Sequence, residues 1–129
     1  MPPPHRTSLS ILTLGVAGLA LAGCVEEQNR RDLRVVDGNP ELGQVAVAAY
    51  DCGVCHVIPG VRSARGTVGP SLEGFGRRAY IAGFIPNRPG NLTTWIEDPP
   101  SLAPNTAMPD VGVTAEEAKH IAAYLYMLR

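Results

Sequence analysis

Hydrophobic residues recur at helical spacing in two parts of the chain, just after residue 40 and close to the C-terminus. The first set is Leu42, Val45, Ala46 and Ala49. Before it, Asn39, Pro40 and Glu41 supply an N-cap, a proline at the first helical position and an acid in the first turn. The pattern predicts a helix that starts at Pro40 and ends between Tyr50 and Cys52.

The second set predicts the last helix of the chain. Thr114 and Glu117 have the spacing of a capping box, in which each side chain satisfies a backbone amide of the first turn. One apolar stripe follows, at Ala118, Ile121, Ala122, Leu125 and Leu128. The stripe predicts a helix that buries one face.

The chain between these helices shows no alternating pattern of a β-strand. Segments 57–76 and 101–112 are rich in Gly and Pro and are predicted to be loops. We expect a short helical turn at 79–84 and a short helix at 92–97, capped by Asn91 and stopped by Pro99 and Pro100. The predicted fold class is therefore all-α, with three to four short helices joined by long loops.

The N-terminal segment, 1–23, predicts an export signal. His5 and Arg6 precede an apolar run at 9–21, which has the length of a signal-peptide core and is short for a membrane span. The run ends in Leu21-Ala22-Gly23-Cys24, which resembles a bacterial lipobox. We expect cleavage before Cys24 and lipidation of its thiol; the alternative is an ordinary secretory signal.

Composition divides the rest into a tether and one domain. Segment 24–39 is polar and charged and is predicted to be a flexible tether, and 40–129 is predicted to be the folded domain.

The 129 residues carry 11 Lys and Arg against 12 Asp and Glu, a net charge of −1. This balance excludes a strongly basic nucleic-acid-binding protein.

The strongest chemical motif is Cys52-Gly53-Val54-Cys55-His56. Two thiols three residues apart, followed by an imidazole, are typical of covalent haem c attachment, with His56 as a ligand of the iron. A thioredoxin-like redox pair is an alternative, but it normally follows a strand. A zinc site is another, but it would need a fourth ligand, and the remaining cysteine, Cys24, lies in the lipobox.

With this motif, segment 40–129 resembles the class I c-type cytochromes. Gly69-Pro70-Ser71-Leu72 is similar to the Gly-Pro-x-Leu segment of that family, and Trp95 with Met108-Pro109 is similar to its distal segment. The resemblance implies a cytochrome c fold around one covalently bound haem. Pro70 would accept a hydrogen bond from His56, and Trp95 would pack on the distal face of the haem.

The same resemblance implies that Met108 is the second axial ligand of the haem iron. Met127 and His120, both in the last predicted helix, are the other candidates for that position. The resemblance also implies that Gly43 and Tyr124 meet where the first and last helices cross.

An iron with His and Met on both axial positions has no open coordination site, so the predicted function is one-electron transfer and not catalysis. We expect a lipid-anchored carrier on the periplasmic side of a bacterial membrane. Its protein partners would be a cytochrome bc-type donor and a terminal oxidase as acceptor, with no nucleic acid and no small-molecule substrate. The alternative is a fixed redox subunit of a haem–copper oxidase or another membrane complex; a haem enzyme or ligand sensor is a third.

Charge is unevenly distributed along the domain. Segment 60–90 holds one acid, Glu73, and five arginines, Arg62, Arg65, Arg77, Arg78 and Arg88. Segment 95–117 holds five acids and no basic residue. We hypothesise that the arginine-rich part meets an acidic surface of a redox partner, since opposite charges steer association.

Overall fold

The structure is a computed structural model that describes residues 33–129. The predicted signal peptide 1–23, the predicted lipidation site Cys24 and the first part of the predicted tether lie outside the described residues. Chain contacts divide the protein into Met1–Asp32 and Leu33–Arg129, of which the second unit is described here. No helix within residues 33–129 has the length and hydrophobicity needed to cross a membrane.

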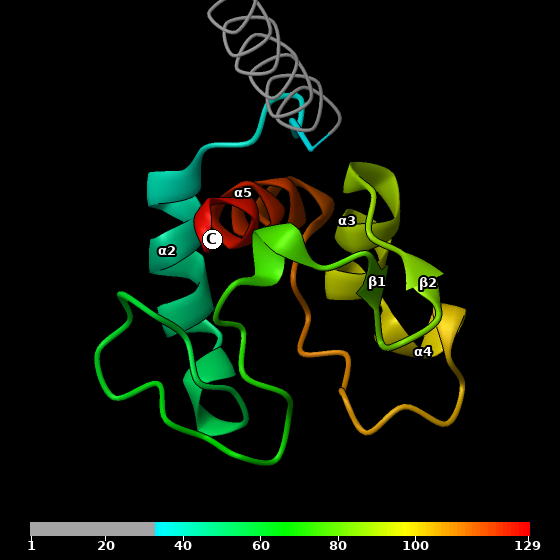
Figure 1. Cartoon of the computed structure of the whole chain (residues 1–129), viewed down its shortest axis with the longest axis horizontal. Coiled ribbons are helices and arrows are strands. Elements are labelled where there is room, and N and C mark those ends of the chain that lie inside the picture. Colours follow the sequence, from blue (N-terminus) through cyan, green and yellow to red (C-terminus); the bar gives the residue numbers. More distant parts are fainter. Residues whose placement is uncertain (1–32) are drawn as a thin grey trace, which may run out of the picture. The chain divides into compact units, whose positions relative to one another are not determined.

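The described unit combines helices with one small sheet (Figure 1). Its helices are α2 (Pro40–Ala49), α3 (Pro89–Glu97), α4 (Pro99–Leu102) and α5 (Ala115–Met127), with 3-10 turns η1 (Cys52–Val54) and η2 (Phe75–Arg77). Strands β1 (Tyr80–Ile81) and β2 (Ile85–Pro86) pair antiparallel.

The prediction of an all-α cytochrome c fold is therefore wrong. Segment 79–84, expected to be a helical turn, belongs to a hairpin in which Ile81 pairs with Ile85. Ala82 and Gly83 have positive φ angles of 50° and 83°, which turns the chain back on itself. Ile81 and Ile85 are both buried, and their burial in the core stabilises this pairing.

The two principal helices begin where their caps predict. The Asn39 side chain accepts a hydrogen bond from the Leu42 amide at 2.9 Å, and Pro40 is the first residue of α2. At α5, Thr114 and Glu117 form both bonds of the capping box. The starts of both helices are confirmed.

The helices between them differ from prediction at their ends. Helix α3 starts at Pro89, and the Asn91 side chain donates to the Pro86 carbonyl at 2.9 Å instead of capping a helix. The helical chain resumes directly after the expected stop, because the Asp98 side chain caps the one-turn helix α4.

Helices α2 and α5 cross in direct contact at Gly43. A Cβ atom at Gly43 would lie 2.0 Å from the His120 carbonyl oxygen and 2.8 Å from Tyr124 Cβ, so only glycine permits this approach. The predicted meeting of Gly43 and Tyr124 is confirmed. The Asn39 amide also donates to His120 Nδ1 at 3.1 Å, which joins the start of α2 to α5.

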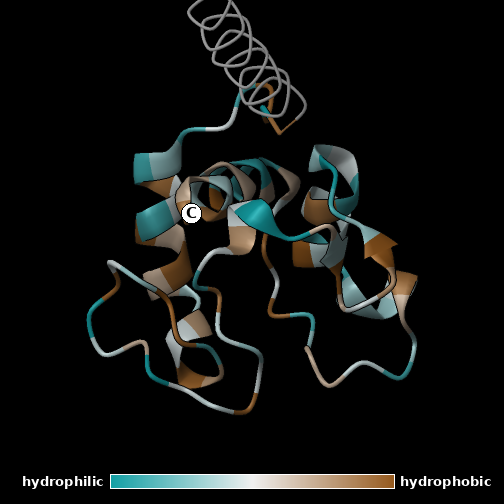
Figure 2. Ribbon diagram, viewed as in Figure 1, coloured by the Kyte–Doolittle hydropathy of each residue, from teal (hydrophilic) through white to brown (hydrophobic). Residues whose placement is uncertain are grey.

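One hydrophobic core connects the helices with the loops. Hydrophobic stretches, brown in Figure 2, lie on the loops below the helices as well as on the helices themselves. The largest fully buried side chains are Val47, Leu92 and Pro99. Leu33 and Val35, within the predicted tether 24–39, pack against the same core.

Candidate functional site

The Cys52–His56 motif forms a tight turn directly after α2. Asp51 has a left-handed backbone, with φ 54°, which redirects the chain into η1. The Cys52 carbonyl accepts hydrogen bonds from the amides of Cys55 at 3.2 Å and His56 at 3.0 Å. This turn gathers two free, half-buried thiols and one imidazole within five residues.

Burial raises the pKa of the Cys52 thiol, and the negative charges of Asp51 and of a Cys55 thiolate raise it further. A raised pKa makes the Cys52 thiol a weaker nucleophile. This shift does not favour the thioredoxin-like alternative, in which an attacking cysteine has a lowered pKa.

The orientation of His56 is fixed from the next loop. Its Nδ1 lies 2.7 Å from the carbonyl oxygen of Pro70. Because a carbonyl can only accept, Nδ1 carries the proton, and in the neutral ring Nε2 keeps a lone pair that can bind a metal. A hydrogen bond of this kind is the usual way in which a protein orients a ligating histidine.

Glycines bring the following loop against this turn. A Cβ atom at Gly69 would lie 2.3 Å from His56 Cε1, and one at Gly66 would lie 2.1 Å from the Val54 carbonyl oxygen. The Gly69 amide donates to the Cys55 carbonyl at 2.8 Å. The glycine content predicted a loop here, and the resemblance implied the bond from His56 to Pro70, but nothing in the sequence pattern predicted that the backbone at Gly69 touches the imidazole.

Arg78 is a second feature that the sequence pattern did not reveal. Its guanidinium donates to the carbonyls of Ser71 and Glu73 and lies over the Phe75 ring, 5.4 Å from the ring centre. Arg78 therefore clamps the chain immediately after Pro70. This half-buried arginine is bound to its own main chain, whereas the docking hypothesis counted all five arginines of segment 60–90 alike.

Met108 lies in the opposite loop, between α4 and α5. It is half-buried against the hydrophobic core, and its amide donates to Thr106 Oγ1 at 3.2 Å. Trp95 is buried in the same core from α3. The structure thus places Met108 and Trp95 at the core, and none of the hydrogen bonds within residues 33–129 joins Met108 to His56.

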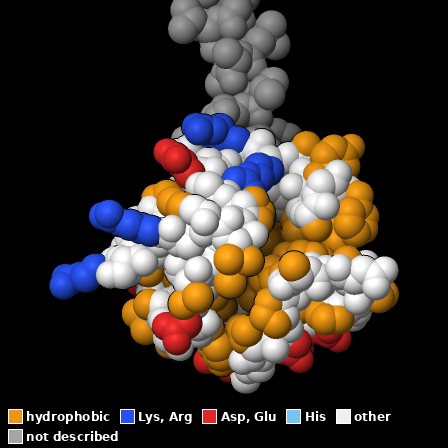
Figure 3. All heavy atoms as spheres, turned by 90° about the horizontal axis from the view of Figure 1, so that it is seen from below, with side chains coloured by type: hydrophobic (Ala, Val, Ile, Leu, Met, Phe, Trp, Pro, Cys, Tyr) orange, Lys and Arg blue, Asp and Glu red, His pale blue; other side chains and the backbone are white. Residues whose placement is uncertain are grey.

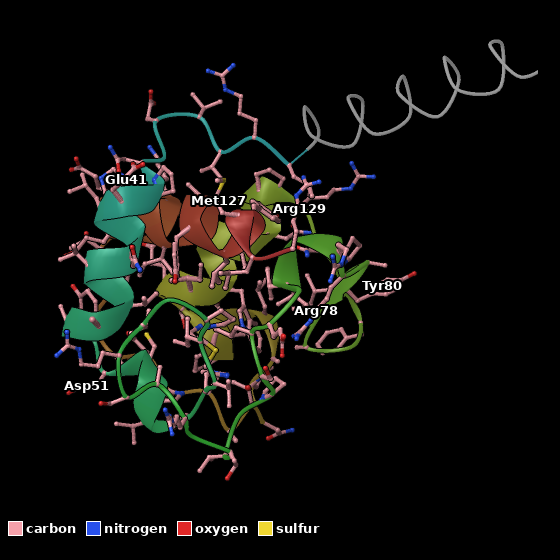
Figure 4. All side chains as sticks on the ribbon, turned by 60° about the vertical axis from the view of Figure 1, so that its left-hand side comes forward. Glu41, Asp51, Arg78, Tyr80, Met127 and Arg129 are labelled. Carbon is pink, nitrogen blue, oxygen red and sulfur yellow. The ribbon has the colours of Figure 1, made fainter. Side chains whose placement is uncertain are left out.

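The alternative axial ligands lie elsewhere. Met127 is 68% exposed on α5, and His120 is held at the α2–α5 crossing by the Asn39 amide. Figure 4 shows Met127 on the side of the domain away from Asp51, which precedes the cysteine turn. Met127 and His120 thus belong to α5 and not to the loops that carry His56 and Met108.

A hydrogen-bonded clasp holds the end of the Met108 loop. Tyr50 donates to Glu117 at 2.7 Å, which links the end of α2 to the start of α5. Hydrogen bonds from Thr114 and Tyr50 lower the pKa of Glu117, and the same bond raises the pKa of Tyr50. Both loops of the candidate site are thus attached to the helical frame.

The face that carries these loops is hollowed. Figure 3, a view from below Figure 1, shows a hollow bordered by hydrophobic side chains. Exposed valines occur on each of the segments that carry site residues, at Val54, Val68 and Val111. The site residues therefore lie on segments with an apolar surface.

No protein-family model matches the chain. The chain is 37% identical over 88 residues to the cytochrome c oxidase subunit 2 of Alkalihalophilus pseudofirmus. The match covers 67% of this chain and 25% of that protein, so the chain spans about a quarter of the length of the relative. A match of this length must include the middle of the chain, and with it the segment from Cys52 to Pro70.

These findings correct the prediction of one haem c as cofactor. The relative is named as a subunit of an oxidase and not as a c-type cytochrome. Across residues 33–129, no group of three or more His, Cys, Asp and Glu side chains is arranged to hold a metal ion, although Cys52, Cys55 and His56 are close in sequence.

Proposed function

We propose that this protein is an electron-transfer subunit of a membrane-bound cytochrome c oxidase complex. The observation that carries the proposal is the match of two thirds of the chain to a cytochrome c oxidase subunit 2. It favours the predicted alternative, a fixed redox subunit, over the first expectation of a carrier that moves between complexes. On this proposal the chain conducts single electrons, and the complex performs the oxidase reaction.

The residues that we propose for the redox site are Cys52, Cys55, His56 and Met108; in residues 33–129 the two cysteines and His56 are not already arranged as a three-ligand metal site. Thiol, imidazole and thioether groups are soft donors that suit redox-active transition metals. The His56–Pro70 hydrogen bond supports this role, because it leaves Nε2 as a donor in a fixed orientation. We chose these four residues because their positions resemble those of the site residues in class I c-type cytochromes.

The proposed location is the outer face of a membrane, with Cys24 as the lipid anchor. An oxidase subunit must stay with its complex, and a lipid on the chain keeps the domain at the same surface. The partners are then the other subunits of the complex and a redox protein that delivers electrons.

The redox site is tested on the full chain purified from its own membranes. Absorption spectra recorded during an electrochemical titration should show one reversible one-electron transition. Cys52→Ala with Cys55→Ala should abolish it, and Met108→Ala should shift it. Met127→Ala is the matched control, because Met127 is exposed on α5, and it should leave the transition unchanged.

A wild-type chain with no redox transition, or one that Met108→Ala and Met127→Ala affect equally, would contradict the proposed site. Metal analysis of the same samples identifies the bound group, and porphyrin bands in the reduced spectrum would identify that group as a haem. Association with the complex is tested separately. The tagged chain should co-purify with the oxidase subunits in high salt, and elution without them would support a mobile carrier instead.

A further inference from the structure

The aromatic residues of this domain are distributed unequally between core and surface. Phe75, Trp95, Tyr124 and Tyr126 are all buried, as the few large side chains of a small domain should be. Tyr80 and Phe84, by contrast, are 55% and 60% exposed. Both exposed aromatics belong to the hairpin of β1 and β2, so the hairpin presents an unusual concentration of exposed aromatic surface.

The hairpin is anchored, so this exposure is a fixed feature. Ile81 and Ile85 hold its inner face in the core, while Tyr80 pairs with Pro86 on the exposed face. At its base the buried Asn87 donates from its side chain to the Arg78 carbonyl at 2.9 Å. Figure 4 shows Tyr80 pointing away from the body of the domain.

The segment that contains the hairpin carries charge of one sign between Glu73 and Glu97. Segment 74–96 contains three arginines and no acidic residue. Arg78 is engaged by the carbonyls of Ser71 and Glu73, whereas Arg77 and Arg88 are exposed before and after the hairpin. The surface is therefore aromatic and basic.

We propose that Tyr80, Phe84, Arg77 and Arg88 form a docking surface for an acidic face of another oxidase subunit. We call these four residues the hairpin surface; its role rests on the proposed function. Tyr and Arg are enriched among residues that dominate protein–protein binding energy, and arginine pairs with carboxylates in a two-pronged geometry. An anionic membrane would also attract the arginines, but two aromatic side chains offer little area for insertion.

Hydrogen bonds through Arg78 link the segment of the hairpin surface to the candidate redox site. Arg78 lies between them, since its guanidinium holds the carbonyl of Ser71, the residue after Pro70. Pro70 in turn orients His56. A partner docked on the hairpin surface would therefore contact the segment whose Arg78 holds the loop that orients His56.

The experiment measures binding of the full chain to the purified oxidase of the same cells, in detergent and at several salt concentrations. The variant Tyr80→Ser with Phe84→Ser should weaken binding by about tenfold or more. Its matched control is Leu42→Ser with Val45→Ser, two exposed apolar residues on α2, which should bind within about twofold of wild type.

The charged half of the surface has its own variant and control. Arg77→Glu with Arg88→Glu should weaken binding and flatten its salt dependence, because the pairs that salt screens are lost. Arg62→Glu with Arg65→Glu changes the same charge on two exposed arginines of the preceding loop and should have a smaller effect. Circular dichroism of each variant confirms that it is folded.

Wild-type affinity in both hairpin variants, or equal losses in the controls, would overturn the hairpin surface while leaving the proposed function intact. A wild-type chain that does not bind the oxidase would overturn both. Hairpin-dependent binding to vesicles of anionic phospholipid, without binding to the oxidase, would replace the protein partner by a membrane.

Discussion

The helical frame and the loops of the candidate site are held together by different interactions. In the frame, α2 and α5 start at side-chain caps and cross where Gly43 allows their backbones to touch. In segment 57–74, backbone amides and the Arg78 guanidinium bind backbone carbonyls, and Gly69 lies against His56. The frame is thus fixed by packing between helices, and the loops by hydrogen bonds to the main chain.

Because of this difference, the stability of the domain and the geometry of the candidate site should respond to different substitutions. A substitution in the frame should lower the stability of the whole domain, because α2, α3 and α5 share one core. A substitution in the loops should move His56 or Met108 at a smaller cost, because fewer buried side chains are involved.

The largest effect is expected at the helix crossing. Gly43→Ala places a methyl group 2.0 Å from the His120 carbonyl, and neither helix backbone can yield without losing the crossing. We expect a loss of about 3 kcal/mol in the free energy of unfolding, measured by urea denaturation. Gly90→Ala, in α3, is the matched control, because no atom lies within 4 Å of its Cβ, and it should cost nothing. Equal losses in both variants would mean that the close crossing is unimportant.

The next effect should fall on the site itself. Gly69→Ala places a methyl group 2.3 Å from His56 Cε1, so the imidazole must move away from Pro70. We expect the redox transition to shift strongly, with a stability loss of about 1 to 2 kcal/mol. Spectra and urea denaturation of the same samples separate the two effects. A large stability loss with an unchanged redox transition would contradict the role of this contact.

The frame could be predicted from the sequence because its information is local. Asn39 and Pro40 for α2, and Thr114 with Glu117 for α5, are cap residues that act within one turn. The hairpin could not be predicted, since two strands of two residues are too short to show alternation. Its turn also uses Ala82 in a left-handed conformation that normally favours glycine.

In the candidate site, too, one part could be predicted from the sequence and another could not. The spacing of Cys52, Cys55 and His56 is a local signal, so the turn that gathers them was expected. The contacts of Arg78 and Gly69 depend on where segments distant from the turn come to lie in the folded chain. Two adjacent arginines in a sequence give no sign of which one will be engaged by main-chain carbonyls.

A smaller effect is expected at Arg78. Arg78→Met removes hydrogen bonds to the Ser71 and Glu73 carbonyls and the contact with the Phe75 ring, while it keeps the aliphatic part of the side chain. We expect a loss of about 1 to 2 kcal/mol in the free energy of unfolding and a modest shift of the redox transition. Arg77→Met, at the exposed neighbour, should change stability by less than about 0.5 kcal/mol. If both variants behaved alike, the clamp would contribute nothing beyond charge.

The smallest effect is expected at the Tyr50–Glu117 hydrogen bond, which links α2 to the end of the Met108 loop. It is a loss of stability that occurs only at acidic pH. Hydrogen bonds from Thr114 and Tyr50 hold the pKa of Glu117 below its usual value in the folded state. A carboxylate with a lowered pKa stabilises the fold above the ordinary carboxyl pKa, and this contribution is lost as the pH falls through the lowered value. The melting temperature of wild type should therefore fall between about pH 5 and pH 2. Glu117→Gln should reduce this fall, and Glu116→Gln, in the same first turn of α5, should reproduce the wild-type profile. Identical profiles for the two variants would show that the clasp carries no acid-dependent stability, and the end of the Met108 loop would then be held by packing alone.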